Sequence, residues 1–277
     1  MTMATTQPDA AALLDLLLLQ QARHTDLSSR RARRASRDRL TALFHDLQAA
    51  IRPDMVLEIG AYDAGFSTRM AKAGVRAFAF EASPYNYRRF SETMLRVGPL
   101  LSYRHCAISD TDGAATFEIK ARVDGHEVAR EAGNNSLLRR SDEVGAIEYE
   151  SVTVPSLRLE SFLRAEGLTD HSFSAWIDVE GALSKVIGGC GSALRTCQSV
   201  IVELEEAPYW EGQMLFHEAI GWFVGQGFLP VARDFESRHQ FNVVFVRTDR
   251  LRQPEVRLVL ARHFGGAHDA AADGEAW

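Results

Sequence analysis

Residues 55–67, MVLEIGAYDAGFS, decide the fold. A short, unbroken apolar run leads into Glu58, and a turn with Gly60 and Gly65 precedes an amphipathic segment at 68–74. Buried parallel strands have such unbroken apolar runs. A strand that ends in an acidic residue and a glycine turn before a helix is typical of the first strand of a nucleotide-binding α/β fold. The stretch therefore predicts a strand, a ligand-binding turn and a helix, and the alternative is a glycine that only reverses the chain.

The composition is that of a soluble globular protein. The chain has 277 residues, of which 46% are hydrophobic and 25% charged, enough for one large α/β domain with appendages. A net charge of −6 argues against nucleic acid as a partner. Three cysteines without CxxC spacing favour a reducing compartment. The apolar run at 10–19 is too short to span a bilayer, so we expect a cytoplasmic protein without membrane association.

The first fifty residues predict helices. Asp9 can cap a leucine-rich helix at 9–19, which packs on the main domain or pairs with a second subunit as a homodimer. Residues 30–39, RRARRASRDR, contain six arginines. We interpret them as a solvated helix face beside an acidic domain or substrate entrance, in preference to an RNA- or membrane-binding arm. Residues 1–52 are thus assigned to an N-terminal helical extension that caps the main domain or mediates dimerisation.

Strands and helices alternate from residue 55 onward, which predicts a mainly parallel sheet with helices on both faces. The loop at 121–144 is long and polar, as functional loops often are. Two segments, 114–120 and 149–154, read as a half-exposed strand pair, and another antiparallel pair closes the fold. The remaining expected elements are strands at 75–81, 101–108, 173–179, 199–204, 227–232 and 241–247 and helices at 84–97, 156–166, 212–226 and 255–264.

Acidic residues gather at the predicted carboxyl ends of the strands, where ligands bind in such sheets. Glu81 follows Glu58 by 23 residues, at the position from which an acid accepts hydrogen bonds from ribose hydroxyls. Asp63 in the first turn is a poor neighbour for a diphosphate but suits a cofactor with an ammonium and a sulfonium. S-adenosylmethionine therefore fits this site better than NAD.

An ordered series of motifs resembles the FkbM family of S-adenosylmethionine-dependent methyltransferases. The resemblance covers residues 55–247 and rests on LEIGAYDAGFS, AFEASPYNY, CAISDTDGAATFEI, NNSLL, VPSLRLESFL, WIDVEGA and VIVELEE. It implies an α/β class I methyltransferase fold, with a Rossmann-like, mainly parallel sheet whose last strand is antiparallel. Residues 53–250 would be the methyltransferase catalytic domain, and residues 251–277 a C-terminal helix and flexible tail.

The resemblance also implies roles for individual residues. Glu58 and Gly60 resemble the motif at the methionyl end of the cofactor, and Glu81 resembles the ribose-binding acid. Tyr62 and Ala64 stand where the family usually has Asn and Gly. Ala82, Cys106 and Ala107 correspond to the adenine side, and Asp178 lies close to the transferring methyl. The expected cofactor-binding residues are Glu58, Gly60, Ala61, Tyr62, Asp63, Ser67, Glu81, Ala82, Ala107, Ser136 and Asp178.

Methyl transfer to an alcohol requires removal of the hydroxyl proton, by a protein base or with the help of a metal. Asp178 and Glu203 are candidates for either task, and together they are the predicted ligands of Mg²⁺, a candidate second cofactor. His217 and His239 are further candidate bases. We expect Glu180 to hydrogen-bond backbone at the start of the following helix.

The function that we expect is O-methylation of a hydroxyl on a sugar, glycan or secondary metabolite. The partner is then a small hydroxylated acceptor, with no nucleic acid and no membrane. Two alternatives remain open from the sequence. One is N-methylation of an amino sugar or small amine, and the other is a non-catalytic cofactor-binding or assembly module.

Overall fold

The computed structural model describes residues 21, 25–141 and 146–272, with side chains up to residue 264. Two compact units make up the chain: the first combines Met1–Ile51 with Phe216–Trp277, and the second is Arg52–Leu215. The divisions between these units fall after residues 51 and 215, and the predicted domain boundaries after residues 52 and 250 stay predictions. No helix in the described ranges has the length and hydropathy needed to cross a membrane.

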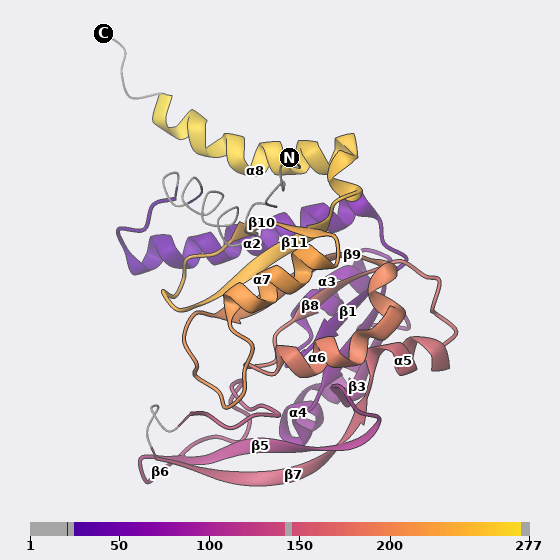
Figure 1. Cartoon of the computed structure of the whole chain (residues 1–277), viewed down its shortest axis with the longest axis vertical. Helices are drawn as coiled ribbons and strands as arrows, with labels where there is room; N and C mark the ends of the chain where they lie inside the picture. Colours follow the sequence, from indigo (N-terminus) through magenta and orange to yellow (C-terminus); the bar gives the residue numbers. More distant parts are fainter. Residues whose placement is uncertain (1–20, 22–24, 142–145, 273–277) are drawn as a thin grey trace, which may run out of the picture. The chain divides into compact units, whose positions relative to one another are not determined.

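Five parallel strands form the sheet of the second unit, in the order β9-β8-β1-β2-β3 (Figure 1). The strand predicted from the opening motif, β1 (Met55–Ile59), lies between two others and pairs in parallel with both. All five of its residues are buried, which explains its unbroken apolar run. The prediction of a mainly parallel α/β sheet is confirmed. The other strands are β2 (Arg76–Glu81), β3 (Leu101–His105), β8 (Phe173–Ile177) and β9 (Cys197–Glu205).

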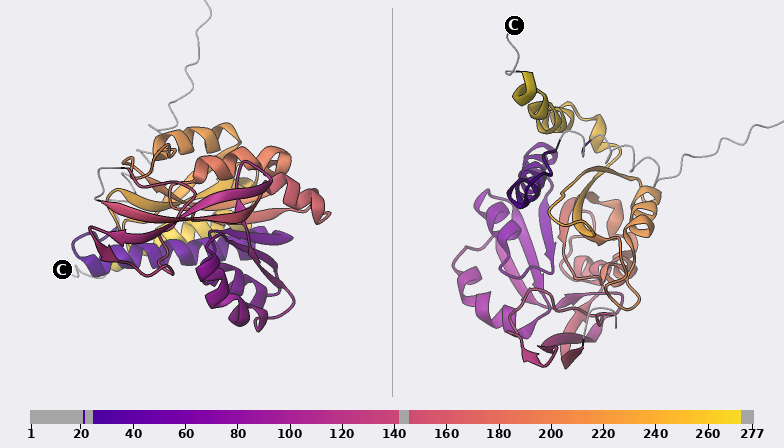
Figure 2. Two further views of the ribbon diagram at one scale, coloured as in Figure 1. Left: turned by 90° about the horizontal axis from the view of Figure 1, so that it is seen from below. Right: turned by 90° about the vertical axis from the view of Figure 1, so that its left-hand side faces the viewer.

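Helices cover both faces of these strands. In Figure 2, α3 and α4 lie on one side of the parallel strands, and α5 and α6 lie on the other. Right-handed crossovers place helices on opposite faces when the strand order reverses, here between β1 and β8. The carboxyl ends of these two strands therefore form the switch point at which such sheets bind ligands. The helices are α3 (Gly65–Lys72), α4 (Pro84–Leu95), α5 (Leu159–Ala165) and α6 (Leu183–Cys190), followed by the 3₁₀ turn η2 (Gly191–Arg195).

A second, four-stranded sheet has the order β4-β7-β5-β6. The predicted pairing of 114–120 with 149–154 is confirmed and is longer than expected, since β5 (Gly113–Val123) and β7 (Ile147–Leu157) run antiparallel throughout (Figure 1). The short strands are β4 (Ala107–Ile108) and β6 (His126–Glu127).

This second sheet corrects two predicted elements. The single strand expected at 101–108 is wrong, because β3 ends at His105 and residues 107–108 pair with β7 instead. The helix expected from residue 156 begins at Leu159, because β7 continues to Leu157. The crossing from one sheet to the other brings Cys106 and Ala107 beside the end of β2, where the N–H of Cys106 donates to the carbonyl oxygen of Glu81 (3.0 Å).

The described residues of the first unit include an antiparallel strand pair and several helices. The predicted closing pair is confirmed as β10 (Phe228–Arg233) and β11 (Gln240–Arg247). The other elements are α2 (Arg30–Ile51), α7 (Phe216–Gly225), η3 (Arg250–Arg252) and α8 (Pro254–Ala272). Helix α2 packs against α8 and both strands.

The arginine-rich segment forms the start of α2. Its first turns are largely exposed, and the helix buries Leu40, Phe44 and Leu47 further along, at helical spacing. Glu236 binds two of the arginines, Arg37 at 2.7 Å and Arg34 at 3.5 Å. The helix predicted at 9–19 lies outside the described residues, and the homodimer stays a prediction.

Candidate active site

A cavity of about 460 Å³ lies at the carboxyl ends of β1, β2 and β8. This is within the usual volume range of small-molecule sites. Short stretches from six places in the second unit form its wall, including the loop at 132–137. The lining residues are Ile59, Gly60, Tyr62, Phe80, Glu81, Ala82, Ser83, Asn86, Cys106, Ala107, Ile108, Phe117, Ala132, Gly133, Asn134, Asn135, Leu137, Asp178, Val179, Glu180 and Ala182.

The turn after β1 depends on a glycine at its first position. Gly60 has φ +80°, and a Cβ there would lie 1.6 Å from the carbonyl oxygen of Asp178. No side chain fits at this distance, so the backbones of the two turns can approach only because the residue is glycine. Tyr62 (φ 44°) and Ala64 (φ 51°) are also left-handed. The two residues that depart from the family pattern thus have a left-handed backbone conformation that Asn or Gly adopts more easily.

Glu58 is buried beneath this turn and outside the cavity wall. Its carboxylate accepts hydrogen bonds from the N–H groups of Ser67 (2.7 Å) and Phe66 (3.3 Å) at the start of α3. Burial raises its pKa to about 7, and these hydrogen bonds partly oppose the increase. In the structure the residue therefore ties β1 to the helix, and its expected contact with the methionyl group stays a prediction.

Glu81 ends β2 and lies in the cavity wall. One carboxylate oxygen accepts from the N–H of Tyr62 and the other from the N–H of Ser83, both at 2.7 Å. Burial raises its pKa to about 7. The side chain of Asn86 is a third hydrogen-bond partner of this carboxylate. Because two carboxylate oxygens have four lone pairs in total, an acceptor site remains for a ligand hydroxyl. The position and the free acceptor site suit the predicted contact with a ribose.

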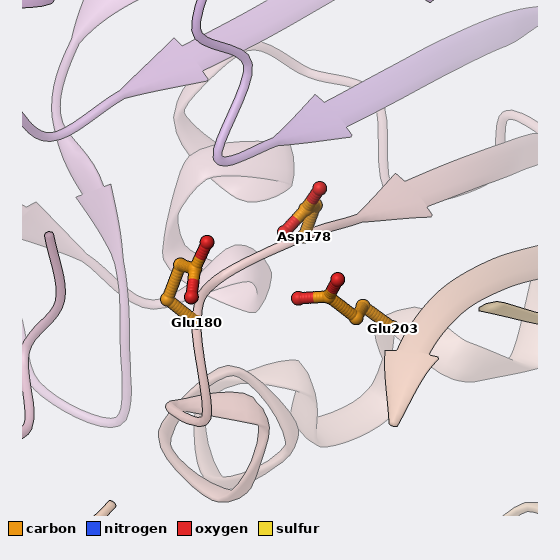
Figure 3. Close-up of side chains that lie close together, drawn as sticks. All are labelled: Asp178, Glu180 and Glu203. Atoms are coloured by element: carbon orange, nitrogen blue, oxygen red, sulfur yellow. The ribbon is translucent and has the colours of Figure 1, made fainter. Parts of the chain in front are cut away.

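Three carboxylates meet at the ends of β8 and β9. Asp178, Glu180 and Glu203 each place an oxygen within 4.8 Å of the others, and Figure 3 shows the side chains converging. The carboxylates of Asp178 and Glu203 lie close together, and a hydrogen bond between two such groups requires a shared proton. Burial raises the pKa of both groups, and the charge of Asp178 raises that of Glu203 further. The cluster can therefore hold a proton or a cation.

Glu180 is a site residue that the sequence interpretation assigned to the wrong task. Helix α6 begins without any side-chain cap, so the expected hydrogen bond at the helix start is absent. Instead Glu180 lines the cavity, and its Oε2 has no partner among the described residues. Burial and the charge of Asp178 raise its pKa to about 8.

The loop at 133–136 closes one side of the cavity. Asn135 orders it, because its amide donates to the carbonyl oxygens of Arg130 and Ala132 (both 3.0 Å) and accepts from the N–H of Lys120 (2.9 Å). Ser136 is not part of the wall, and its hydroxyl donates to the carbonyl oxygen of Glu180 (2.7 Å). The polar loop thus contributes Asn135 to the wall and holds the turn after β8 through its serine.

The structure brings together only part of the predicted site. Of the expected cofactor-binding residues, six line the cavity: Gly60, Tyr62, Glu81, Ala82, Ala107 and Asp178. Five lie outside its wall: Glu58, Ala61, Asp63, Ser67 and Ser136. The candidate bases His217 and His239 belong to the other compact unit, and their catalytic roles stay predictions. Polar lining residues missed by the prediction are Ser83, Asn86, Asn134 and Glu180.

The charges in the wall are all of one sign. Glu81, Asp178 and Glu180 are acidic, and none of the described lining residues is Lys, Arg or His. Phosphate groups bind where basic side chains or free helix N-termini face them. A cavity with three carboxylates and no basic side chain in its described wall favours a cationic ligand over a phosphorylated one.

Comparisons with known proteins match the sequence to a methyltransferase family. The model of the methyltransferase FkbM domain matches residues 58–230. The curated 2-O-methyltransferase NoeI of Sinorhizobium fredii (strain NBRC 101917 / NGR234) is 29% identical over 173 residues, which cover 59% of this chain and 68% of the relative.

Two solved structures show a distant likeness. Magnesium protoporphyrin IX methyltransferase (ChlM) of Synechocystis PCC 6803, with bound SAM, is 9% identical over 88% of this chain and all of that chain, with a TM-score of 0.44. The 1,6-didemethyltoxoflavin-N1-methyltransferase of Burkholderia thailandensis is 14% identical over 90% of this chain and 94% of that chain, with a TM-score of 0.38. The family assignment rests on the domain match, which covers more than half of the chain and includes every lining residue of the cavity: this protein belongs to the FkbM methyltransferase family.

Proposed function

We propose that this methyltransferase uses S-adenosylmethionine to methylate a hydroxyl group of a sugar, glycan or secondary metabolite. The single observation that carries the cofactor is the charge of the cavity, whose described wall has three carboxylates and no basic side chain. S-adenosylmethionine carries a sulfonium and an ammonium, which such a wall accommodates, whereas a dinucleotide would bring two phosphates. The hydroxyl acceptor is favoured because the curated relative is named a 2-O-methyltransferase.

In the proposed complex the cofactor lies across the strand ends. The ribose binds Glu81, whose carboxylate keeps a free acceptor site, and the methionyl group lies at Gly60. The adenine packs beside Ala107, Ile108 and Phe117, which form an apolar part of the wall. The sulfonium then lies toward Asp178. Methyl transfer is an in-line displacement, so this positioning supplies much of the catalysis.

The acceptor hydroxyl loses its proton at the acidic cluster in this proposal. Asp178, Glu180 and Glu203 supply three oxygen ligands within 4.8 Å of one another, a donor set that fits a hard cation such as Mg²⁺. We propose Asp178 and Glu203 as its ligands, with Glu180 as the third. A bound Mg²⁺ would stabilise the negative charge that develops on the acceptor oxygen. Without it, the same carboxylates remain the nearest groups to take the proton.

A methyl-transfer screen with radiolabelled S-adenosylmethionine tests the proposal. The acceptors are neutral sugars, oligosaccharides, hydroxylated aromatic compounds and matched amino sugars, each with wild-type protein and with Glu81→Ala. We expect transfer to a hydroxyl by the wild type and at least a tenfold loss in the variant. Preferred transfer to an amine would replace O-methylation by N-methylation. If S-adenosylmethionine does not bind to the wild type in a separate titration, only a non-catalytic assembly module remains.

A further inference from the structure

Trp210 packs directly against the turn that carries Glu180 into the cavity. The indole is 2% exposed, and a Cβ on Gly181 would lie 2.3 Å from its Cδ1. Gly181 also has φ +81°. The residue beside Glu180 must therefore be glycine for the indole to touch the backbone, and the indole blocks any movement of the turn to that side.

Two cations hold the indole in place. The guanidinium carbon of Arg140 is 4.3 Å from the centre of the Trp210 ring, and the ammonium of Lys120 is 5.2 Å from it. Such distances allow cation–π attraction. The backbones of Arg140 and Trp210 form an antiparallel bridge, and the backbone N–H of Trp210 donates to Oε1 of the Gln213 side chain (2.7 Å). The indole is thus fixed by β5, by the segment after the polar loop and by the segment after β9.

Glu180 itself is in an unfavourable backbone conformation. Its φ is +49°, in the left-handed region that a glutamate rarely adopts. Ser136 donates to its carbonyl oxygen on one side (2.7 Å), and Trp210 fills the space beside Gly181 on the other. Strained residues persist where the surrounding structure overdetermines them, which is common at active sites. The result is a carboxylate in the cavity wall whose buried Oε2 has no hydrogen-bond partner in the described part of the chain.

We propose that Trp210, anchored by Arg140 and Lys120, is a positioning residue that holds the Glu180–Gly181 turn so that Glu180 reaches the acceptor. The proposal rests on the methyl-transfer function proposed above. It goes beyond that function by assigning a task to three residues outside the cavity wall. It also explains why a buried aromatic residue with two cations around it lies behind an acidic site.

The test combines a structural and a kinetic readout. Hydrogen exchange of the amides of residues 180–183 is measured in the wild type, in Trp210→Ala and in the conservative Trp210→Phe. We expect at least a tenfold faster exchange in the alanine variant and near wild-type exchange in the phenylalanine variant. Trp222→Ala, which removes a tryptophan from α7 in the other unit, is the matched control. Unchanged exchange at 180–183 in Trp210→Ala would overturn the proposal, whether or not an acceptor has been found.

The kinetic readout is a double-mutant cycle with Glu180→Gln. Misplacement by about 1 Å can cost about 100-fold in rate, so Trp210→Ala should lower kcat by about 10- to 100-fold with cofactor affinity unchanged within about threefold. In the Glu180→Gln background the same substitution should cost less than about threefold, because it acts through Glu180. Equal losses in both backgrounds would contradict the proposal. Failure of methyl transfer by the wild type would instead refute the proposed function and leave the exchange result to decide the positioning.

Discussion

Replacement of Glu81 by glutamine isolates the contact that we assign to the cofactor ribose. The side chain is 5% exposed and accepts one backbone N–H on each oxygen, so both oxygens are held facing the cavity. Glutamine has the same shape but offers only one acceptor oxygen, and its amide is a donor. One of the two ribose hydroxyls would therefore lose its acceptor, and the other would bind a neutral oxygen in place of a carboxylate.

The structure sets the size of the effect. A hydrogen bond to a charged group contributes about 1.5 to 3 kcal/mol. Loss of one such bond corresponds to an increase in Kd of about 10- to 150-fold, since about 1.4 kcal/mol is a factor of ten. The variant also loses one backbone acceptor, at Tyr62 or at Ser83, which costs about 1 to 3 kcal/mol of folding stability. Its Kd is therefore compared at a temperature well below unfolding.

Calorimetric titration with S-adenosylhomocysteine measures this change. Glu118→Gln is the matched control, because Glu118 is also a buried strand carboxylate (8% exposed) but does not line the cavity. We expect the control to bind within about twofold of the wild type. An affinity of Glu81→Gln within threefold of the wild type would refute the assignment of Glu81 to the ribose.

Three further predictions concern the turn, the buried acids and the cation. Gly60→Ala should destabilise the protein by several kcal/mol in urea unfolding and abolish cofactor binding, because its Cβ would lie 1.6 Å from the carbonyl oxygen of Asp178. The control Gly125→Ala, with a similar φ of +79° but open space around the Cβ, should cost only about 1 to 2 kcal/mol of folding stability. Similar losses of stability in the two variants would show that the contact at Gly60 is not restrictive. Burial raises the pKa of Glu205 from 4.5 to about 7, so the unfolded chain loses its proton first and the stability of the cofactor-free protein falls as the pH rises between these values. Glu205→Gln should remove up to about 3 kcal/mol of that loss at pH 8 and change little at pH 4.5, whereas parallel pH–stability curves for variant and wild type would contradict the attribution. EDTA should abolish turnover and Mg²⁺ restore it in the wild type, with Glu203→Gln weakening the dependence on Mg²⁺, and turnover indifferent to both would leave a carboxylate as the base.

The sequence predicted the parts of the fold that depend on local pattern. The first strand, its glycine turn and the acid at the end of β2 all followed from apolar runs and spacing, and each lies at the cavity. Long-range pairing was less accessible. Residues 107–108 continue the hydrophobic pattern of β3 but pair with β7. The local pattern does not predict this pairing, because the partner strand lies about fifty residues further along the chain.

The candidate site shows the same difference between features that a local pattern predicts and features that depend on the folded structure. The sequence position of Glu58 predicts a contact with the ligand. In the folded turn, however, the nearby N–H groups of α3 donate hydrogen bonds to its carboxylate. The position of Glu180 just before a helix predicts a hydrogen bond at the helix start. Its backbone is instead left-handed, and the residue lines the cavity. The turn at Glu180 and Gly181 packs against Trp210, about thirty residues further along the chain, so a local pattern does not predict this arrangement.

A crystal structure with S-adenosylhomocysteine tests the central claim most directly. We predict that the ligand occupies the cavity at the ends of β1, β2 and β8, with both ribose hydroxyls about 2.5 to 3.0 Å from the carboxylate of Glu81. The sulfur atom should point toward Asp178. A ligand bound elsewhere, a ribose away from Glu81, or an empty cavity at saturating ligand would contradict it.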